Sequence, residues 1–408
     1  MHVAVVGGGA VGSSIALDLA TRGLEVVLLE REEALGAGAS PGSAGYLCPS
    51  HTAPLPSPGA LRDGIRWLFS RTSPFHLKPR LSLVPWLAQF VRASTPGSAA
   101  RGTALLRALA SDSLQLHAEL AARGVDTGFD RCGILNVYER PRTLARGGIE
   151  LRAAVAAGVA GELLDEREAR ALEPSLRGPL AGAIYYREDA ICDPRRYAAA
   201  VGAAARSLGA EIRTGVEVLA CARRGARIVR LETTRGSVEA DVYVLAAGWP
   251  STDLARSVGV RLRLEPGKGY HLDYALDDRQ PVLPVFLQDA RVTTTRLSDR
   301  LRLTGVLDLD GGDPRIDRRR LDAIPAAARR MFGSDVLGEV VEVWRGHRPC
   351  LPDGLPAIGR IPSVENGFVA TGHATLGLTL APVTGALVGD LVVGARPRRD
   401  LEAFRVGR

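Results

Sequence analysis

The chain has 408 residues, of which 46% are hydrophobic and 24% are charged, enough for two or three domains with ordinary cores. Its net charge of +7 comes from scattered arginines and not from a basic run, which argues against nucleic-acid binding and indicates mild attraction to anions or an acidic membrane surface. The five cysteines form no C-x-x-C pair and no zinc spacing, so we expect free thiols and no metal site. Neither a cleavable signal nor a membrane-spanning stretch is evident, and the cytoplasm is the expected location.

The chain begins with a pattern typical of a strand, a glycine turn, a helix and a second strand. Val3–Val6 is a mostly β-branched run bounded by glycine and predicts a buried strand. Gly7–Gly12 fits G-x-G-x-x-G, and residues 13–22 predict a helix that stops at a glycine. Residues 25–29 predict a second strand, which ends on Glu30.

Each part of this pattern has a role in holding a dinucleotide. Gly7 permits the turn, Gly9 lets the backbone approach a pyrophosphate, and Gly12 lets helix and strand pack closely. The helix N-terminus offers unpaired N–H groups to the phosphates. Glu30 stands where a carboxylate accepts the ribose hydroxyls of an adenosine. A purely structural glycine turn is the alternative, but the order of the elements favours a dinucleotide site.

Two segments follow whose roles the composition leaves open. The small residues of 36–45 suit backbone wrapped around a ligand, although a flexible linker would have the same composition. Residues 54–94 hold two of the four tryptophans, mixed with basic residues. They predict a pair of amphipathic helices that cover the core, and a face that meets lipid or a partner is the alternative.

The middle of the chain alternates between helices and short strands. A helix is predicted over 99–124, a strand over 133–138 and a short capped helix over 165–172. Asp193-Pro194 is a strong helix start, and apolar residues then recur at helical spacing as far as Leu208. Short strands are predicted at 211–213, 227–233 and 237–239.

The last part of the chain returns to the first domain. Residues 241–248 predict a buried strand that closes this domain beside the dinucleotide. Alternating patterns over 262–308 predict an antiparallel sheet, a second domain inserted between halves of the first. Residues 367–373 predict a further strand, and the apolar run 374–393 predicts a buried helix.

Taken in order, these pieces resemble a known family. The chain resembles the FAD-dependent amino-acid oxidoreductases of the D-amino-acid oxidase and glycine oxidase superfamily, and among them the bacterial D-amino-acid dehydrogenases. Each motif alone is modest, but their shared order over nearly the whole chain is specific. The motifs are the N-terminal fingerprint, Ser40–Gly45, Gly133–Leu135, Asp193–Arg195, Leu245–Trp249, Gly267–Tyr270, Trp344–Pro349, Pro352–Gly354 and Gly372–Gly377.

The resemblance implies an α/β fold with two interleaved domains. A Rossmann-like FAD-binding domain would alternate with an α+β substrate domain built on a mostly antiparallel sheet, a glutathione-reductase-like fold of the D-amino-acid-oxidase type. Residues 1–62, 185–262 and 345–408 are assigned to the FAD-binding domain, and residues 63–184 and 263–344 to the substrate domain. Substrate is expected over the flavin at the interface.

The family's flavin contacts carry over to the fingerprint, to the small-residue loop and to later turns. FAD is expected to bind non-covalently, because Cys350 does not align with the attachment cysteine of monomeric sarcosine oxidase. A helix N-terminus after Gly372 would stabilise the negative charge of the reduced flavin. The expected cofactor contacts are Gly7, Gly9, Ala10, Val11, Gly12, Glu30, Arg31, Ser40, Ala44, Gly45, Tyr46, Val216, Ala247, Gly248, Trp249, Gly372, His373, Ala374, Thr375, Leu376 and Gly377.

The resemblance also assigns a substrate anchor. Arg348 falls where glycine oxidases and their relatives place the arginine that binds the substrate carboxylate, a role that suits a planar guanidinium. A surface arginine is the alternative. His347 and Arg291 are expected to contact substrate as well. Thr375 stands where glycine oxidase has arginine, which argues against glycine oxidation.

Two further residues are expected to assist catalysis. Lys268 and Tyr270 belong to a motif that the dehydrogenases share, and the Lys268 ammonium could bind a water or a flavin carbonyl. A chance lysine at a surface turn is the alternative. His373 is expected to serve mainly through its backbone.

The implied reaction is oxidation of an α-amino acid, by analogy a D-amino acid, to an imine that water hydrolyses to a 2-oxo acid. Hydride would pass from Cα to flavin N5. Oxidation of a cyclic or N-substituted secondary amino acid (D-proline, hydroxyproline or sarcosine) stays open, as does a glycine or D-amino-acid oxidase that uses oxygen. A non-catalytic flavin- or NAD-binding module is a third class.

The expected electron acceptor is a membrane quinone, reached by peripheral contact with the inner face of the membrane. Aromatic and basic residues within 54–94 have the composition of an interfacial helix. These residues are Trp67, Phe69, Phe75, Trp86 and Phe90, with Arg71, Lys78, Arg80 and Arg92. Packing against the substrate domain is the alternative for most of them.

Overall fold

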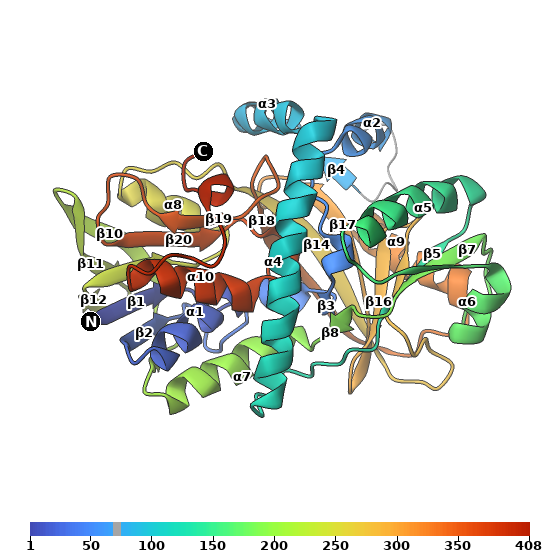
Figure 1. Cartoon of the computed structure of the whole chain (residues 1–408), viewed down its shortest axis with the longest axis horizontal. Coiled ribbons are helices and arrows are strands. Elements are labelled where there is room, and N and C mark those ends of the chain that lie inside the picture. The colour runs from blue at the N-terminus through green and yellow to red at the C-terminus, as the bar shows by residue number, and fades with distance from the viewer. Residues whose placement is uncertain (68–74) are drawn as a thin grey trace.

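The computed structural model describes residues 1–67 and 75–408. Two large sheets lie side by side, and the long helix α4 (Pro96–Ala122) runs between them across the front (Figure 1). Residues from the two ends of the chain meet in the first sheet, which has six strands. These are β1 (His2–Val6), β2 (Glu25–Leu29), β9 (Glu211–Arg213), β13 (Val242–Leu245), β19 (Ala357–Arg360) and β20 (Gly367–Thr371).

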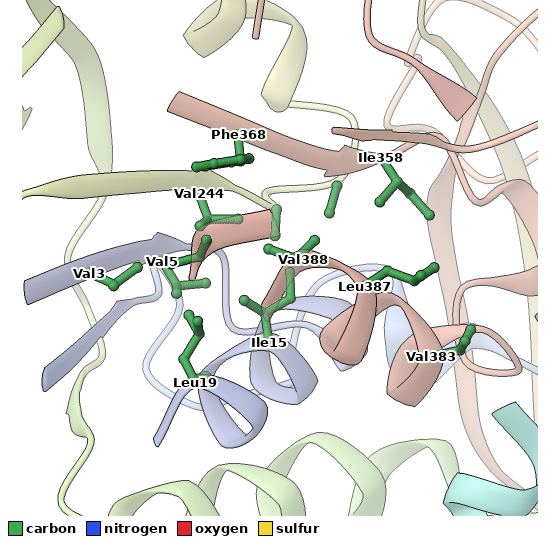
Figure 2. Close-up of a cluster of buried hydrophobic side chains, with 14 of the residues drawn as sticks. Val3, Val5, Ile15, Leu19, Val244, Ile358, Phe368, Val383, Leu387 and Val388 are labelled. Atoms are coloured by element: carbon green, nitrogen blue, oxygen red, sulfur yellow. The ribbon is translucent and has the colours of Figure 1, made fainter. Parts of the chain in front are cut away.

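The six-stranded sheet is mostly parallel. Its order is β19-β20-β13-β1-β2-β9, and β1 pairs in parallel with both β2 and β13. One face is covered by α1 (Ala10–Thr21), α7 (Pro194–Ser207) and α10 (Ala381–Val392). Val5 of β1 meets Ile15 of α1 and Val388 of α10 in this core (Figure 2). The strands predicted at the N-terminus, at 241–248 and at 367–373 are therefore confirmed.

The opposite face of this sheet is also buried. Successive residues of a strand point to opposite faces, so Ala4 and Val6 lie on this side. They pack under α8 (Ser251–Ser257) and a three-stranded sheet. That sheet consists of β10 (Val218–Arg224), β11 (Arg227–Thr233) and β12 (Gly236–Val238). Burial on both faces explains why β1 reads as an unbroken apolar run.

The second sheet has nine strands and is mostly antiparallel, as predicted. Among its pairs, only β5–β15 and β4–β17 are parallel. Its order is β18-β14-β17-β16-β15-β5-β7-β6, with β4 beside β17. The strands are β4 (Phe75–Leu77), β5 (Ile134–Tyr138), β6 (Glu162–Leu164), β7 (Gly182–Tyr186), β14 (Glu265–Ala275), β15 (Val285–Leu287), β16 (Val292–Arg296), β17 (Arg300–Leu309) and β18 (Val340–Cys350). Its segments alternate along the chain with those of the first sheet, and the domain boundaries given above stay predictions.

Helix starts follow the capping residues read from the sequence. Asp165 forms a capping box with Glu168 at the start of α6 (Glu166–Leu172). Asp193 accepts hydrogen bonds from two backbone N–H groups of α7. The helix predicted from residue 374 was placed too early, because α10 begins only at Ala381, with a proline in its first turn. A short 3-10 turn, η4 (Ala374–Leu376), stands before it.

Several elements were not predicted. They include α5 (Pro141–Ala156), α9 (Arg318–Phe332), α8 and β10. A small sheet of β3 (Tyr46–Leu47) and β8 (Ala190–Ile191) joins the loop after β2 to the chain before α7. All five cysteines are free thiols, as expected.

The segment 54–94 forms α2 (Pro58–Trp67) and α3 (Val84–Ala93), which lie at one edge of the molecule (Figure 1). Trp86 is buried and stacks on Phe90 at 5.2 Å, so the aromatic face of α3 points into the protein. Trp86 and Phe90 therefore pack against the nine-stranded sheet, as the packing alternative predicts, and do not form an interfacial face. The side chains of Trp67, Phe69 and Arg71 lie outside the described residues. No helix within 1–67 and 75–408 has both the length and the apolar character that a bilayer crossing requires.

Candidate active site

A cleft of about 480 Å³ lies where the β1–α1 turn meets the edge of the nine-stranded sheet. Its floor and walls come from the end of β2, the loop 37–43 and residues 246–250. The edge strand β18 borders it over residues 344–349, and the turn after β20 closes the far end. Chain segments from both sheets thus contribute to one cavity.

The glycine fingerprint has the geometry that a pyrophosphate needs. A Cβ at Gly12 would stand 1.8 Å from the Gly7 carbonyl oxygen, so no side chain fits between helix and strand there. The N-terminus of α1 has Gly9 at its cap and no side-chain cap, while Gly9, Ala10 and Val11 line the cleft. The positive end of the helix dipole therefore faces this space, with the N–H groups of the first turn that Ser40 does not bond.

Glu30 lies at the end of β2 as predicted, and it also holds the fingerprint in place. Its carboxylate accepts hydrogen bonds from Gly8 N at 2.6 Å and from Glu32 N at 2.9 Å. A carboxylate offers about four acceptor sites, so further sites remain for ribose hydroxyls. Ser40 Oγ accepts from Ala10 N at 2.9 Å, which draws the small-residue loop over the start of α1. Most of residues 37–43 thus line the cleft, and the loop is not a free linker.

Arg302 is a structural residue of this site that the sequence did not reveal. It is fully buried, and its Nη1 donates to the carbonyl oxygens of Pro41 and Ser43 in the cleft loop. Nε and Nη2 each lie 2.8 Å from a different oxygen of Asp273. Burial alone would raise the pKa of Asp273, but the hydrogen bonds and charge of Arg302 outweigh it and hold that pKa below its ordinary value. Arg302 therefore ties the cofactor loop to the nine-stranded sheet.

Trp344 is a second residue whose place only the structure reveals. Its ring lies against Gly42 and Gly346, where a Cβ would approach within 1.9 and 2.1 Å. On the other side it stacks on His271, with ring centres 5.2 Å apart. His271, Asp273 and Glu342 come close enough to suggest a metal site, but Asp273 and Glu342 are bonded to arginines. The cluster thus supports the cleft wall through ion pairs.

Arg348 presents a cation to the cleft. It pairs across the ladder with Gly267, and its guanidinium lies over Gly269, where a Cβ would be 2.0 Å from Nη1. Nη1 donates to the carbonyl oxygen of Val306 at 3.1 Å. Within the described residues Arg348 has no ion pair, and the nearby carboxylate of Asp308 is bonded to Arg320.

Arg348 is partly buried, and this burial lowers the pKa of its guanidinium. A desolvated guanidinium without a carboxylate is stabilised by an anion that arrives from outside. The cleft can therefore hold a carboxylate beside Arg348.

Most of the expected site residues do meet in the cleft. His347 borders it, and its Nε2 is buried without a hydrogen-bond partner in the described chain. The expected residues that line the cleft are Gly7, Gly9, Ala10, Val11, Glu30, Arg31, Ser40, Val216, Ala247, Gly248, Trp249, His347, Arg348, His373, Ala374, Thr375 and Gly377. The expected cofactor contacts that do not line it are Gly12, Ala44, Gly45, Tyr46, Gly372 and Leu376.

Lys268, Tyr270 and Arg291 lie outside this lining. The Lys268 ammonium is bonded to Asp310 and to two backbone carbonyls, which leaves it no donor for a flavin carbonyl. The Tyr270 hydroxyl accepts from the backbone N–H of Asp317 at 3.3 Å. Arg291 is exposed, and its Nη1 donates to the side-chain oxygen of Gln288. The geometry gives none of the three a direct contact with this cleft.

His373 agrees with the backbone role expected for it. Its Nε2 lies 3.1 Å from the hydroxyl of Thr384, and burial lowers its pKa to about 4, so the ring is neutral at neutral pH. The helix N-terminus expected after Gly372 does not form, since α10 begins beyond the lining residues and only the short turn η4 borders the cleft.

Comparisons with known proteins agree with this architecture. A family model described as DAO, FAD dependent oxidoreductase, matches residues 2–391. A D-amino acid dehydrogenase of Methylobacterium nodulans is 34% identical, and the match covers 99% of each chain. Glycine oxidase from Geobacillus kaustophilus superposes with a TM-score of 0.80 at 28% identity, over 100% of this chain and 98% of that one.

The fold extends to more distant enzymes. L-proline dehydrogenase from P. horikoshii has a TM-score of 0.75 at 18% identity, with 99% and 96% of the chains covered. The family match spans the glycine fingerprint, the cleft loop and the edge strand, so it covers each segment from which the cleft is built. This chain belongs to the DAO family of FAD-dependent oxidoreductases, and FAD is its cofactor.

Proposed function

We propose that this enzyme oxidises the Cα–N bond of an α-amino acid, in the first place a D-amino acid, to an imine that water hydrolyses to the 2-oxo acid. The observation that carries the proposal is Arg348, a desolvated cation in the cleft with no carboxylate partner in the described chain. The relative named D-amino acid dehydrogenase, which matches over the full length, supports the substrate class. FAD supplies the acceptor for the hydride that leaves Cα.

In this proposal the protein mainly positions its substrate. Arg348 binds both carboxylate oxygens and thereby fixes the direction of the Cα–H bond. His347 Nε2, buried and unpaired at the cleft, is placed to share a hydrogen bond with the substrate. Burial lowers the pKa of His347, which favours a neutral ring beside the substrate amine. A neutral amine loses hydride without a strong protein base.

The decisive experiment is anaerobic reduction of the bound flavin. We expect D-amino acids to bleach the flavin absorbance, and the panel includes L-amino acids, glycine, sarcosine, D-proline and hydroxyproline. Faster bleaching by the secondary amines would assign the enzyme to that alternative class. A flavin that none of these compounds reduces would contradict an amine oxidoreductase.

We also propose that the FAD is bound non-covalently. Cys48 and Cys350 are buried, and neither is among the residues that line the cleft. Acid treatment of the purified protein should therefore release all of its FAD into the supernatant. Flavin that stays with the precipitated chain would contradict this.

For the electron acceptor we propose a membrane quinone, with α3 as the contact to the lipid surface. Leu81, Val84 and Val91 recur at helical spacing on the outer side of this segment and are 90%, 56% and 54% exposed. Lys78 and Arg92 beside them are also exposed, and basic residues add about 1 kcal/mol each near an anionic surface. Aliphatic side chains thus take the role first assigned to aromatic ones.

The membrane proposal is tested by flotation with anionic vesicles. The wild type should float, and the Val84→Asp/Val91→Asp double variant should remain at the bottom, because charge on this stripe opposes burial in lipid. Leu219→Asp, at a 59% exposed position of β10 in the three-stranded sheet, serves as the matched control and should float like the wild type. Rapid peroxide formation with oxygen as the sole acceptor, together with no flotation, would refute the proposal.

A further inference from the structure

Both lysines of this chain contact the same loop. Among 52 basic residues only Lys78 and Lys268 are lysines. Lys78 Nζ lies 3.9 Å from the carboxylate of Asp313, and Lys268 Nζ is bonded to Asp310. Both acids belong to the β17–α9 loop, residues 310–316. A chain that uses arginine almost everywhere else therefore has its two ammonium groups at one place.

The Lys268 side chain is bonded to this loop at three points. Besides its ion pair with Asp310, Nζ donates to the backbone carbonyls of Arg315 at 2.9 Å and Asp313 at 3.2 Å. Only 4% of the Lys268 side chain is exposed. Burial disfavours the charged form, but the bond with Asp310 and the nearby Tyr270 raise the pKa of Lys268 above its ordinary value. The ammonium therefore stays charged, and three oxygens of the loop lie within hydrogen-bond reach of it.

The chemistry of the contact explains why lysine stands here. Three oxygens converge on one nitrogen, which suits the three donors of an ammonium group. A guanidinium is planar and spreads its donors over a fork, so it cannot present three N–H groups to one point. Lys268→Arg is therefore not a conservative change at this position.

The loop in turn lies against the cleft. The backbone of Gly312 packs on the indole of Trp249, since a Cβ there would be 3.0 Å from the ring. His347 pairs with Lys268 across the β14–β18 ladder, and the charges of Asp310 and Lys268 both act on its pKa. Trp249 and His347 both line the cleft, and their rings are 5.8 Å apart. The loop thus supports the pair of rings from outside.

We propose that Lys268 is a positioning residue, which anchors the β17–α9 loop behind Trp249 and His347 and so fixes the wall of the cleft where substrate binds. The proposal deepens the function proposed above and rests on it for the identity of the substrate. In this proposal Lys268 acts through the loop and not by a direct contact with the flavin. Loss of the anchor should weaken substrate binding and leave FAD binding intact.

The anchor can be tested on the unaltered holoenzyme. An amine-reactive reagent can modify only the two lysines and the N-terminal amine, and mass spectrometry follows each site. Lys78 is 56% exposed and serves as the internal control. We expect Lys268 to react more slowly than Lys78 by roughly tenfold or more, because reaction requires the loop to open. Equal rates would show that the loop does not hold Lys268 and would overturn the proposal.

Two variants then each change one partner of the Lys268–Asp310 ion pair. Lys268→Met deletes the ammonium, and Asp310→Asn keeps the shape but removes the charge of its partner. Both should speed amide hydrogen exchange in residues 310–316 and raise the KM for the amine substrate roughly tenfold. FAD per chain and the rate of flavin reduction at saturating substrate should stay within about twofold. Lys268→Arg should fall between Lys268→Met and the wild type.

Arg22→Met is the matched control. Arg22 forms a partly buried ion pair with Asp18 and Asp390 at the end of α1, and it touches neither the loop nor the cleft lining. This variant should leave exchange in 310–316 and KM unchanged. If Lys268→Met reduced its flavin more slowly but kept a normal KM and normal amide hydrogen exchange, Lys268 would act on the flavin directly. This result would overturn the proposed anchor. Labelling and exchange need no substrate, so they decide on the anchor even if the amino-acid proposal fails.

Discussion

The two sides of the cleft differ in how far apart along the chain their residues lie. The glycine fingerprint on the nucleotide side is built within the first 40 residues, where Gly12 faces Gly7 and Ser40 bonds Ala10. On the substrate side, Arg348 lies over Gly269 and bonds Val306, a residue 42 positions away. A short stretch of sequence can specify the first arrangement by itself. The second exists only because three strands of the large sheet pair in one register.

The largest effect is expected from a substitution in the glycine fingerprint on the nucleotide side. Gly12→Ala places a Cβ 1.8 Å from a backbone oxygen, which cannot move away as a side chain could. We expect the variant to lose FAD almost completely, measured as flavin absorbance per protein after reconstitution. Gly97→Ala, in the first turn of α4 with nothing within 4 Å of the new Cβ, should retain full flavin. Normal FAD content in Gly12→Ala would contradict the proposed close packing.

The next largest effect is expected on the substrate side, at Arg348. Arg348→Ala should lower kcat/KM on the order of a hundredfold or more, because a charge-assisted pair with the substrate carboxylate is lost in a desolvated site. Arg348→Lys should lose less, since a cation remains. Steady-state kinetics with flavin content as the control measure the difference. Wild-type kcat/KM in Arg348→Ala would remove Arg348 from the proposed site.

A smaller effect is expected from Gly269→Ala, which keeps Arg348 but displaces its guanidinium. A Cβ at Gly269 would stand 2.0 Å from Arg348 Nη1, so Gly269→Ala must push the guanidinium aside. A displacement of this size should lower kcat/KM by roughly tenfold while FAD stays bound. Gly148→Ala in α5, where the nearest atom is 3.9 Å away, is the matched control. An effect as large as that of Arg348→Ala would point instead to collapse of the strand pairing.

The smallest expected effect concerns a buried contact outside the cleft lining, between Ser50 and Asp189. The Ser50 hydroxyl donates to Asp189, which is 2% exposed, and burial raises the pKa of Asp189 from 3.8 to about 7. Between these values the folded protein binds more protons than the unfolded chain, so Asp189 makes stability fall as pH rises through this range. Asp189→Asn cannot ionise and still accepts from Ser50.

The Asp189→Asn variant should therefore lose less thermal stability than the wild type between pH about 5 and about 8. Its Tm at the two pH values, compared with that of the wild type, measures the difference. Asp278→Asn, at an exposed acid, should behave like the wild type. A pH dependence that Asp189→Asn leaves unchanged would assign it to other groups.

Site residues with a recognisable sequence motif could be predicted, whereas residues whose role depends on strand pairing could not. Glu30 and Arg348 were identified from a motif and a resemblance, and both line the cleft. Arg302 was not identified and Trp344 was named only as the start of a motif, because the role of each depends on partners in another strand or in the cleft loop. The rarity of Lys268 drew attention to it, but its bonds to Asp310, Asp313 and Arg315 could not be predicted from the sequence, because these partners lie more than 40 residues away.

The sequence by itself determined the parts whose physics is local. A β-branched run, glycines where no Cβ fits, and acids at helix caps each act within a few residues, so β1, α1 and the start of α7 could be placed directly. Only the tertiary structure decided which face of each later strand meets the cleft. That choice depends on ladder register, which brings together residues up to hundreds of positions apart. It turned the aromatic rings of α3 inward, bonded Lys268 to the loop at 310–316, and left Arg348 facing the flavin side without a carboxylate of its own.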